Sequence, residues 1–291
     1  MKKNNKNYLI TLFVALSFGV NAQSGWTKGK GEFFGKIDFA QLSTGNYYAP
    51  DGANLQTNKF TQSTINFYGE YGLQSRWSGI VSMPLWRQNS FSTTNKVSGM
   101  GDLRMDLKYR IIKNQNWPVA ISVGIELPTG RANAYAANKS VPQDRINLPT
   151  GDGEFNIWTT LAASKSLGPG YISAFTAYNF RTKYQDLPFR DVYQVGAEVG
   201  ANPFKPLWVN LKIRSQYSTG ESKYPELGFV RGDGTTYTLY SAEAFVKFSS
   251  KFGGSITYLS GTDLLAPFKN IYISSFLSFG LIYELKPSKT S

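Results

Sequence analysis

The stretch GDLRMDLKYRI, residues 101–111, alternates strictly between charged and apolar side chains. The charged set is Asp102, Arg104, Asp106, Lys108 and Arg110, and the apolar set is Leu103, Met105, Leu107, Tyr109 and Ile111. Successive side chains of a β-strand point to opposite faces of the sheet, so this pattern predicts a strand with one charged and one apolar face. Strands of a soluble β-sandwich and strands of a membrane β-barrel can both show this pattern. The rest of the chain has to distinguish these two folds.

Similar alternation recurs along the chain in about twelve segments of about ten to fifteen residues, longer than the usual soluble strand. The segments are expected near residues 31–42, 59–73, 77–87, 101–112, 117–128, 153–167, 170–184, 191–204, 207–218, 236–252, 254–261 and 271–286. Tryptophans stand near several strand ends, at Trp26, Trp77, Trp117 and Trp208. That position suits the aromatic girdles of a membrane barrel, and the repetition favours a barrel over a sandwich.

The connectors between these segments alternate between short and long. Short connectors fall near residues 74–76, 113–116, 167–170, 205–206 and 252–254, and long polar ones near 43–58, 88–100, 129–152, 185–190, 219–235 and 262–270. Outer-membrane barrels have short periplasmic turns and longer extracellular loops. The sequence therefore predicts one all-β domain over residues 23–291, an antiparallel transmembrane β-barrel of about twelve strands with both termini in the periplasm.

The first residues have the three parts of a secretory signal. Lys2, Lys3 and Lys6 form a basic region, residues 8–20 are largely apolar, and Ala22 ends a small-residue cleavage site. The apolar stretch is shorter than the ~20 residues that a spanning helix needs. We therefore predict a cleavable signal peptide over residues 1–22, and a location in the outer membrane of a Gram-negative bacterium.

The composition argues against an enzyme. The chain has no His and no Cys, and His is the usual general base and a common metal ligand. A carboxylate pair such as Asp102 and Asp106 could do acid–base work, but the basic Arg104 between them favours a salt-bridged wall. We expect no catalytic residues, no cofactor and no metal.

The net charge of +12 does not identify a partner by itself. The compartment in which the protein is expected limits the choice. A basic chain can bind nucleic acid, but an exported protein rarely meets any. We expect outer-membrane lipid and lipopolysaccharide as partners, with a small-molecule solute inside the barrel and no nucleic acid.

Alternation assigns acids and bases in nearly equal numbers to the lumen. The inward acids are Glu32, Asp38, Glu70, Asp102, Asp106, Glu126, Glu154, Glu198 and Glu243, and the inward bases are Lys36, Arg104, Lys108, Arg110, Arg181, Lys212, Arg214 and Lys247. Buried charges have to be paired. We therefore predict a lumen narrowed by ion pairs among Asp102, Arg104, Asp106, Lys108, Arg110, Glu126, Lys212, Arg214 and Glu243, with the excess positive charge in loops and turns.

The longest connector, residues 129–152, is partly apolar. Its apolar residues include Tyr135, Val141, Ile146 and Leu148, and long loops in compact domains are often functional. We expect it to fold over or into the outer mouth and to form part of a ligand pocket. A mobile surface loop is the alternative.

Short motifs resemble one family of outer-membrane barrels. Gly99-Met100-Gly101-Asp102-Leu103, followed by Lys108-Tyr109, resembles the G-x-G-D-L…K-Y strand of barrels assigned to a meta-pathway of phenol degradation. Residues 127–130, Leu-Pro-Thr-Gly, and 150–153, Thr-Gly-Asp-Gly, fit the same family. The resemblance implies an outer-membrane protein for uptake of hydrophobic or aromatic compounds. The matching positions are structural, so it implies no binding residues.

Three functions remain open at this stage. The first is a channel or transporter for passive uptake of small, hydrophobic or aromatic compounds. The second is a porin for anionic oligosaccharides, which a one-sided basic stripe along the lumen would favour. The third is a closed barrel that serves as a structural or secretion-apparatus component. A mixed lumen with an apolar pocket near the outer mouth would favour the first.

The predicted barrel and signal can be tested by fractionation. We expect the protein to lose residues 1–22, to fractionate with outer membranes, and to run faster on gels unboiled than boiled, because closed barrels resist detergent until heated. Amino-terminal sequencing and gel mobility check this. Recovery as a soluble periplasmic protein would contradict it.

Overall fold

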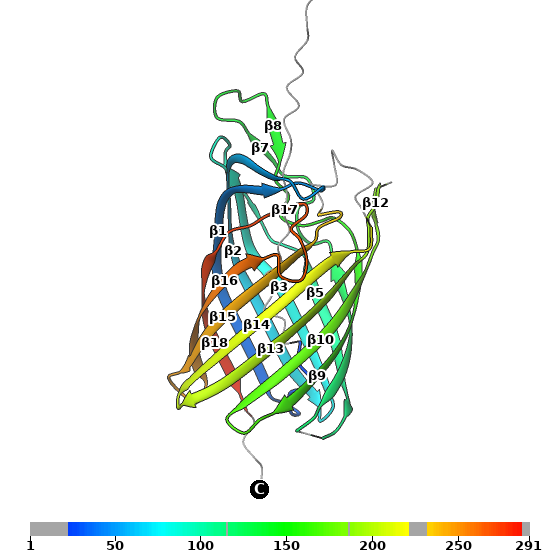
Figure 1. The fold of residues 1–291 in the computed structure, drawn as a ribbon, viewed down its shortest axis with the longest axis vertical. Helices are drawn as coiled ribbons and strands as arrows, with labels where there is room; N and C mark the ends of the chain where they lie inside the picture. The colour runs from blue at the N-terminus through cyan, green and yellow to red at the C-terminus, as the bar shows by residue number, and fades with distance from the viewer. Residues whose placement is uncertain (1–22, 115, 186, 221–231, 287–291) are drawn as a thin grey trace, which may run out of the picture.

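A computed structural model describes residues 23–114, 116–185, 187–220 and 232–286, which form a β-barrel (Figure 1). The predicted signal peptide, residues 1–22, lies outside the described residues. Within the described part of the chain, no helix is long and apolar enough to cross a membrane.

Twelve antiparallel strands make the wall. They are β1 (Phe33–Tyr48), β2 (Asn54–Gln74), β3 (Trp77–Phe91), β5 (Leu103–Ile112), β6 (Val119–Leu127), β9 (Asn156–Ser166), β10 (Gly170–Arg181), β13 (Val192–Phe204), β14 (Leu207–Ser218), β15 (Tyr237–Lys247), β16 (Phe252–Thr262) and β18 (Phe276–Leu285). Each pairs with the next, and β18 pairs with β1 from Phe33↔Leu285 to Ala40↔Ser278, which closes the ring. The predicted all-β barrel is confirmed.

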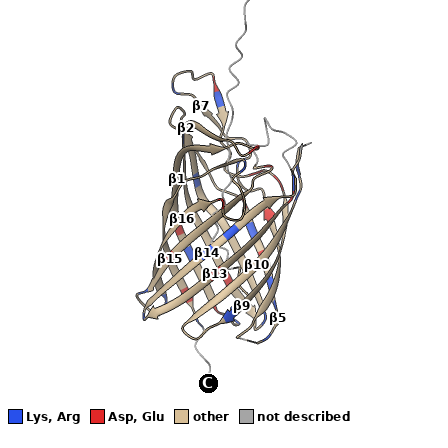
Figure 2. Ribbon diagram, in the orientation of Figure 1, with Lys and Arg blue, Asp and Glu red and all other residues tan. Residues whose placement is uncertain are grey.

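The two faces of the wall have opposite character. Outward side chains such as Leu107, Ile121 and Leu281 are exposed and apolar. Inward side chains such as Asp106 and Lys108 are polar and buried, and Figure 2 shows both signs of charge distributed along the strands. This inside-out arrangement suits a wall that faces hydrocarbon, where only a closed sheet leaves no unpaired backbone groups.

Two connectors predicted as long loops are largely strand. β1 and β2 continue beyond the barrel rim, with Tyr48 paired to Asn54, so only residues 49–53 turn the chain. β3 likewise runs on to Phe91, and β4 (Val97–Gly99) folds back on it. Their polar sequences indicate loops. Above the membrane, however, a hairpin is held by backbone hydrogen bonds and does not require an apolar face. The resulting extension is visible in Figure 1.

The remaining connectors carry short hairpins of their own. β7 (Tyr135–Ala137) and β8 (Arg145–Asn147) form the hairpin that projects furthest above the rim in Figure 1. β11 (Lys183–Tyr184) pairs with β12 (Leu187–Pro188), and β17 (Ile271–Tyr272) pairs with the upper end of β1. The last short turn lies at residues 248–251, earlier than predicted, because β16 begins at Phe252.

An apolar core fills the loop end of the barrel, which we take as the extracellular end. Its buried members are Ala40, Leu42, Tyr47, Phe60, Phe91, Ala136, Ile146, Leu148, Tyr237, Leu239, Ile271, Tyr272 and Phe276. They come from the inner faces of β1, β2, β3 and β15, from the connector that carries β7 and β8, from β17 and from the first residue of β18. We call this set the mouth cluster.

At the opposite end, the segment that precedes β1 lies inside the barrel. The amide of Gly25 donates to Ser164 Oγ at 2.8 Å, and the amide of Lys28 donates to Ser78 Oγ at 2.9 Å. Both serines are buried inward residues of the wall. Residues 23–29 therefore cross the periplasmic part of the lumen.

The predicted aromatic girdle is half right. Trp77 and Trp117 are exposed on the outside of the wall, as a girdle requires. Trp26 instead meets the ring of Tyr171 edge-on at 5.6 Å, and Trp208 lies 6.2 Å from the same ring. Because Tyr171 pairs with Gly200 on the inward side of β10 and β13, Trp26 and Trp208 belong to the lumen.

The outward face allows a test of membrane depth. Ile37, Phe67 and Leu281 share one cross-strand row, near the middle of the apolar band. We expect Leu281→Arg to lower the free energy of unfolding from bilayers by about 2–4 kcal/mol, because a cation there meets hydrocarbon. Gln41→Arg, in the polar outward rows of β1, is the control and should cost about 0–1 kcal/mol. Equal effects in urea titrations of vesicle-inserted protein would contradict this placement.

Candidate functional site: the lumen

A bulge in β3 decides which side chains enter the lumen. The pairing of β2 with β3 passes from Ile65↔Trp86 to Asn66↔Pro84, so Leu85 is an extra residue. A bulge changes the face on which the following residues lie. Strict alternation from Trp77 would place Arg87 outside, whereas the bulge places Arg87 inside, where it is 2% exposed.

Arg87 and its neighbour two residues on hold the returning arm of the third long loop. Arg87 Nη1 donates to the carbonyl of Thr150 at 3.0 Å, and Asn89 Nδ2 donates to the carbonyl of Pro149 at 2.9 Å. Gln62 in turn donates to Asn89 Oδ1 at 3.0 Å. Thr150 is fully buried, so this arm of the loop runs inside the wall.

Asp102 fastens the two arms of this loop to β5. Its Oδ1 accepts the amide of Gly130 at 2.9 Å, and its Oδ2 accepts the amide of Asp152 at 2.7 Å. Gly151 allows this approach, because a Cβ there would lie 2.3 Å from Asp102 Oδ1. The Gly-Asp motif at residues 101–102 thus anchors the loop.

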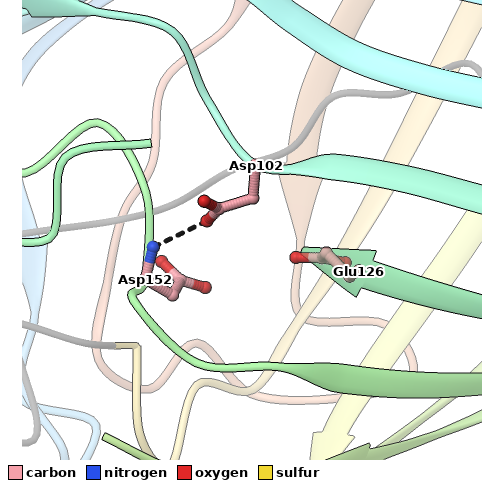
Figure 3. Close-up of side chains that lie close together, drawn as sticks. All are labelled: Asp102, Glu126 and Asp152. Carbon is pink, nitrogen blue, oxygen red and sulfur yellow. Dashed lines mark hydrogen bonds between the residues drawn. The ribbon is translucent and has the colours of Figure 1, made fainter. Parts of the chain in front are cut away.

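Asp102, Glu126 and Asp152 bring carboxylate oxygens within 4.8 Å of one another (Figure 3). Three hard oxygen ligands could in principle hold a cation. Protein donors already serve them: Trp158 Nε1 donates to Glu126 at 2.9 Å, and Arg87 interacts electrostatically with all three. The trio therefore fits an anchor better than a metal site.

The negative charge of the trio affects its loop member. Burial, followed by the nearby charges of Asp102 and Glu154, raises the pKa of Asp152 well above its usual value. As the pH falls, Asp152 therefore takes up a proton before an ordinary aspartate would, and its negative charge is lost. The repulsion between Asp152 and its neighbours Asp102 and Glu154 then decreases in acid.

Arg104 has its partner on its own strand. Its Nε donates to Asp106 Oδ2 at 2.9 Å and its Nη2 donates to Oδ1 at 2.7 Å. The guanidinium also lies 4.5 Å from the centre of the Trp158 ring. Asp106 can lie flat against β6 because residue 124 is Gly; a Cβ there would be 2.2 Å from Asp106 Oδ1.

Other predicted lumen charges form separate pairs. Lys108 Nζ lies 3.7 Å from Glu70, Lys36 Nζ 2.5 Å from Glu243, and Lys212 Nζ 2.8 Å from Glu198. Arg181 pairs with Glu154, and Lys247 with Glu284. The charges that were predicted to form one network thus form several separate ion pairs, at different places around the wall.

Two of the predicted network residues stand apart. Arg110 donates to the carbonyl of Ser75 at 2.8 Å, at the short turn below β3. Arg214 faces the lumen opposite Gly196 and Leu239. In the described part of the chain, neither arginine forms an ion pair.

The residues predicted for a mouth loop separate into two groups. Ile146 and Leu148 are buried in the mouth cluster, with Leu148 fully covered. Tyr135 and Val141 are exposed on the projecting hairpin. The base of the loop thus enters the mouth, and its tip points to solvent.

Aromatic rings dominate the mouth cluster next to that base. Tyr272 stacks on Phe60 with ring centres 5.1 Å apart, and Phe60 meets Phe91 at 5.4 Å. Tyr47 lies 5.2 Å from Tyr272 and donates its hydroxyl proton to Asn270 Oδ1 at 2.8 Å. The mouth is therefore a buried region rich in aromatic rings, above a polar lumen.

Sequence reasoning missed Arg87 and the segment at residues 23–29. Pro84 is the available signal for the first, because proline within a strand favours an edge or a bulge. The sequence gives no clear signal for the second. In the structure Gly25 must be a glycine, because a Cβ there would lie 2.1 Å from the carbonyl oxygen of Pro118.

No family model matches the chain. Solved structures do resemble it. An outer-membrane channel from Pseudomonas putida F1 has 14% identity and a TM-score of 0.64, over 89% of this chain and 97% of that one. The NanC porin has 11% identity and a TM-score of 0.52, over 87% and 100%. The translocator domain of the autotransporter NalP from Neisseria meningitidis has 10% identity and a TM-score of 0.51, over 89% of each chain.

At these identities, the likeness shows the fold. The chain has the fold of transmembrane β-barrels of the outer-membrane kind, the class to which its motifs pointed. The three relatives include a channel, a porin and a translocator domain, so the fold alone does not decide between the functions left open above.

The Arg104–Asp106 pair gives a test of how the lumen is held. We expect Arg104→Ala to destabilise the barrel by about 3–5 kcal/mol, because it leaves Asp106 charged and buried without its partner. The double variant Arg104→Ala with Asp106→Ala should recover part of that loss. Urea titrations followed by gel mobility measure both, with Lys113→Ala in a short turn as the control. A double variant as unstable as the two single losses added would contradict the pairing.

Proposed function

We propose that the protein is an outer-membrane channel for passive uptake of small, largely apolar or aromatic compounds. The observation that carries the proposal is the mouth cluster, a concentration of aromatic rings inside the extracellular end of the barrel. An apolar solute that leaves water gains about 25 cal/mol per Å² of buried apolar surface in such a region, and aromatic rings add favourable ring contacts.

The charges of the lumen support this over a porin for anionic oligosaccharides. Of the basic track that such a porin would use, Arg104, Lys108 and Lys212 are each joined to a carboxylate. The two other residues of that track, Arg110 and Arg214, form no ion pair with a described residue, and Arg110 lies at a turn. A paired lumen offers little net attraction to a chain of anions.

The resemblance to solved structures supports the setting of this proposal. The outer-membrane channel from Pseudomonas putida F1 shares this barrel fold over most of both chains. We infer an outer-membrane location, with membrane lipid around the wall and a small solute inside, and no enzymatic activity. The signal peptide over residues 1–22 belongs to this proposal. A closed barrel with a structural or secretion-apparatus role would fit the packed lumen, but it does not account for the aromatic mouth cluster.

For a solute to pass through the barrel, both the mouth cluster and the segment at residues 23–29 have to move aside. The mouth residues pack against one another, and residues 23–29 cross the lumen below. A cavity of about 20 Å³ lies beside the inner segment, lined by Gln23, Arg104 and Lys108 among others, and it is large enough for about one water molecule. We infer that the base of the third loop moves when a solute enters, because it contributes Ile146 and Leu148 to the cluster.

Deleting residues 132–147 tests this role of the loop. The amide of Thr150 donates to the carbonyl of Arg131 at 2.9 Å, so joining Arg131 to Leu148 leaves a four-residue β-turn in place of the hairpin. The deletion removes Ile146 from the mouth. We expect conductance in planar bilayers and uptake of small aromatic solutes into liposomes to rise several-fold.

Val141→Ala, on the exposed tip of the same hairpin, is the matched control and should leave both quantities unchanged. A second arm uses an anionic oligosaccharide as the solute. Faster permeation of that solute than of an uncharged aromatic one through the intact protein would favour the porin instead. Unchanged permeability in the deletion would count against the loop as a constriction.

A further inference from the structure

Three lysines surround a small pocket at the extracellular end of β2 and β3. The pocket has a volume of about 270 Å³. It is lined by Lys59, Thr61, Ser90, Phe91, Ser92, Thr94, Asn95, Lys96 and Lys139. No acidic residue is among them, whereas hydroxyl and amide groups are plentiful. Apart from Phe91, the lining therefore consists of cations and hydrogen-bonding side chains, the groups that recognise an oxyanion.

The lysines stand on a hydrogen-bonded frame. Asn95 donates its amide proton to the carbonyl of Ala137, and Lys139 donates its amide proton to the carbonyl of Thr93, both at 2.9 Å. The amide of Ser92 donates to the carbonyl of Lys59 at 2.9 Å. Lys59, Lys96 and Lys139 thus come from three segments that the backbone holds side by side, so their arrangement is fixed before a ligand arrives.

These cations differ from those of the lumen in having no carboxylate partner. In the described part of the chain, none of Lys59, Lys96 and Lys139 forms an ion pair. Lys139 Nζ donates to the carbonyl of Ser92 at 2.8 Å, which uses one of its three N–H bonds. Part of the chain's excess positive charge therefore stands here uncompensated.

The part of the pocket formed by β2 and β3 lies on the outward face of the wall. Lys59 and Thr61 alternate with Phe60 and Gln62, which are 0% and 2% exposed and face the lumen. Ser90 pairs with Thr61 and so shares the outward face. A solute inside the barrel would not meet these lysines.

Its position along the wall is above the apolar band, towards the outer surface of the membrane. The row Phe39, Ile65 and Trp86 is the last apolar row on the outward face before the polar row Gln41, Ser63 and Gln88. Thr61 stands four residues beyond Ile65, which is about 10 Å above the apolar edge for a strand tilted by 35–45°. The polar layer of a bilayer begins at that edge, and long lysine side chains reach along the wall.

We propose that this pocket binds a phosphorylated sugar of lipopolysaccharide, the glycolipid of the outer leaflet. The three ammonium groups neutralise and hydrogen-bond the phosphate, and the hydroxyls of Thr61, Ser90 and Ser92 serve the sugar. The site holds the barrel's extracellular rim to its lipid. It rests on the outer-membrane location and is independent of what passes through the lumen.

The test compares two triple variants with the same change of charge. Lys59→Ala, Lys96→Ala and Lys139→Ala are combined in one, and Lys113→Ala, Lys205→Ala and Lys251→Ala, from the opposite end, in the control. Binding of purified lipopolysaccharide to the full-length protein in detergent is measured by native mass spectrometry and by titration. We expect the first variant to bind about tenfold more weakly or worse, since it loses charge-assisted hydrogen bonds, and the control to bind like the wild type.

Further arms identify the ligand chemistry. Wild-type protein should lose affinity to the same extent when the lipopolysaccharide is enzymatically dephosphorylated, and inorganic phosphate alone should bind far more weakly. Equal affinity for the dephosphorylated lipid, equal losses in both triple variants, or binding of free phosphate as tight as that of the lipid would each overturn the proposal. Heat-dependent gel mobility of each variant shows that its barrel is folded, and the single Lys96→Gln variant repeats the test with less perturbation.

Discussion

A backbone that crosses hydrocarbon must hydrogen-bond all its polar groups to itself, and the closure of β18 on β1 meets that requirement. Closure also fixes what the side chains have to do. Because alternate residues face lipid and lumen, every strand must be apolar on one side, and its polar residues are confined within a ring of twelve strands. Such a ring is wider than one that side chains fill and narrower than an open porin. The lumen is therefore occupied by ion pairs, a folded loop and the segment before β1.

The strength of the alternation explains how much of the fold could be predicted. A period of two survives in most of the membrane-facing wall, so the number and order of the strands follow from the sequence. It fails at β3, where one extra residue near Pro84 moves Arg87 from the outside to the centre of the loop anchor. It is also silent above the membrane, where the β1–β2 hairpin continues without an apolar face. Polar sequence is common to loops and to strands in water, and only the pairing partner distinguishes them.

The sequence predicted which charged residues face the lumen, but it did not predict which of them pair with one another. Pattern placed Arg104, Lys108 and Lys212 in the lumen, and the structure puts them there, yet it gives each a separate acid. Partners such as Glu70 for Lys108 and Glu198 for Lys212 depend on register and on side-chain length across the curved wall. The segment at residues 23–29 has no periodic pattern, since it forms no strand. Its place inside the barrel is decided by the hydroxyls of Ser78 and Ser164, which accept its amide protons.

Charge is distributed by the same physics on both sides of the wall. Inside the barrel, a cation without an anion would lose its hydration without a compensating attraction, and most of the described lumen lysines and arginines pair with carboxylates. Outside and above the apolar band, water and headgroups solvate charge, and unpaired lysines can persist there at small cost. A basic protein with a balanced lumen must therefore hold its excess charge on the turns and the rim. At the extracellular rim, Lys59, Lys96 and Lys139 share one pocket because the β7 extension pairs with the β3–β4 connector. Folding of the third loop thus serves the inside and the outside together: its base closes the mouth, and its upper arm completes the cationic pocket.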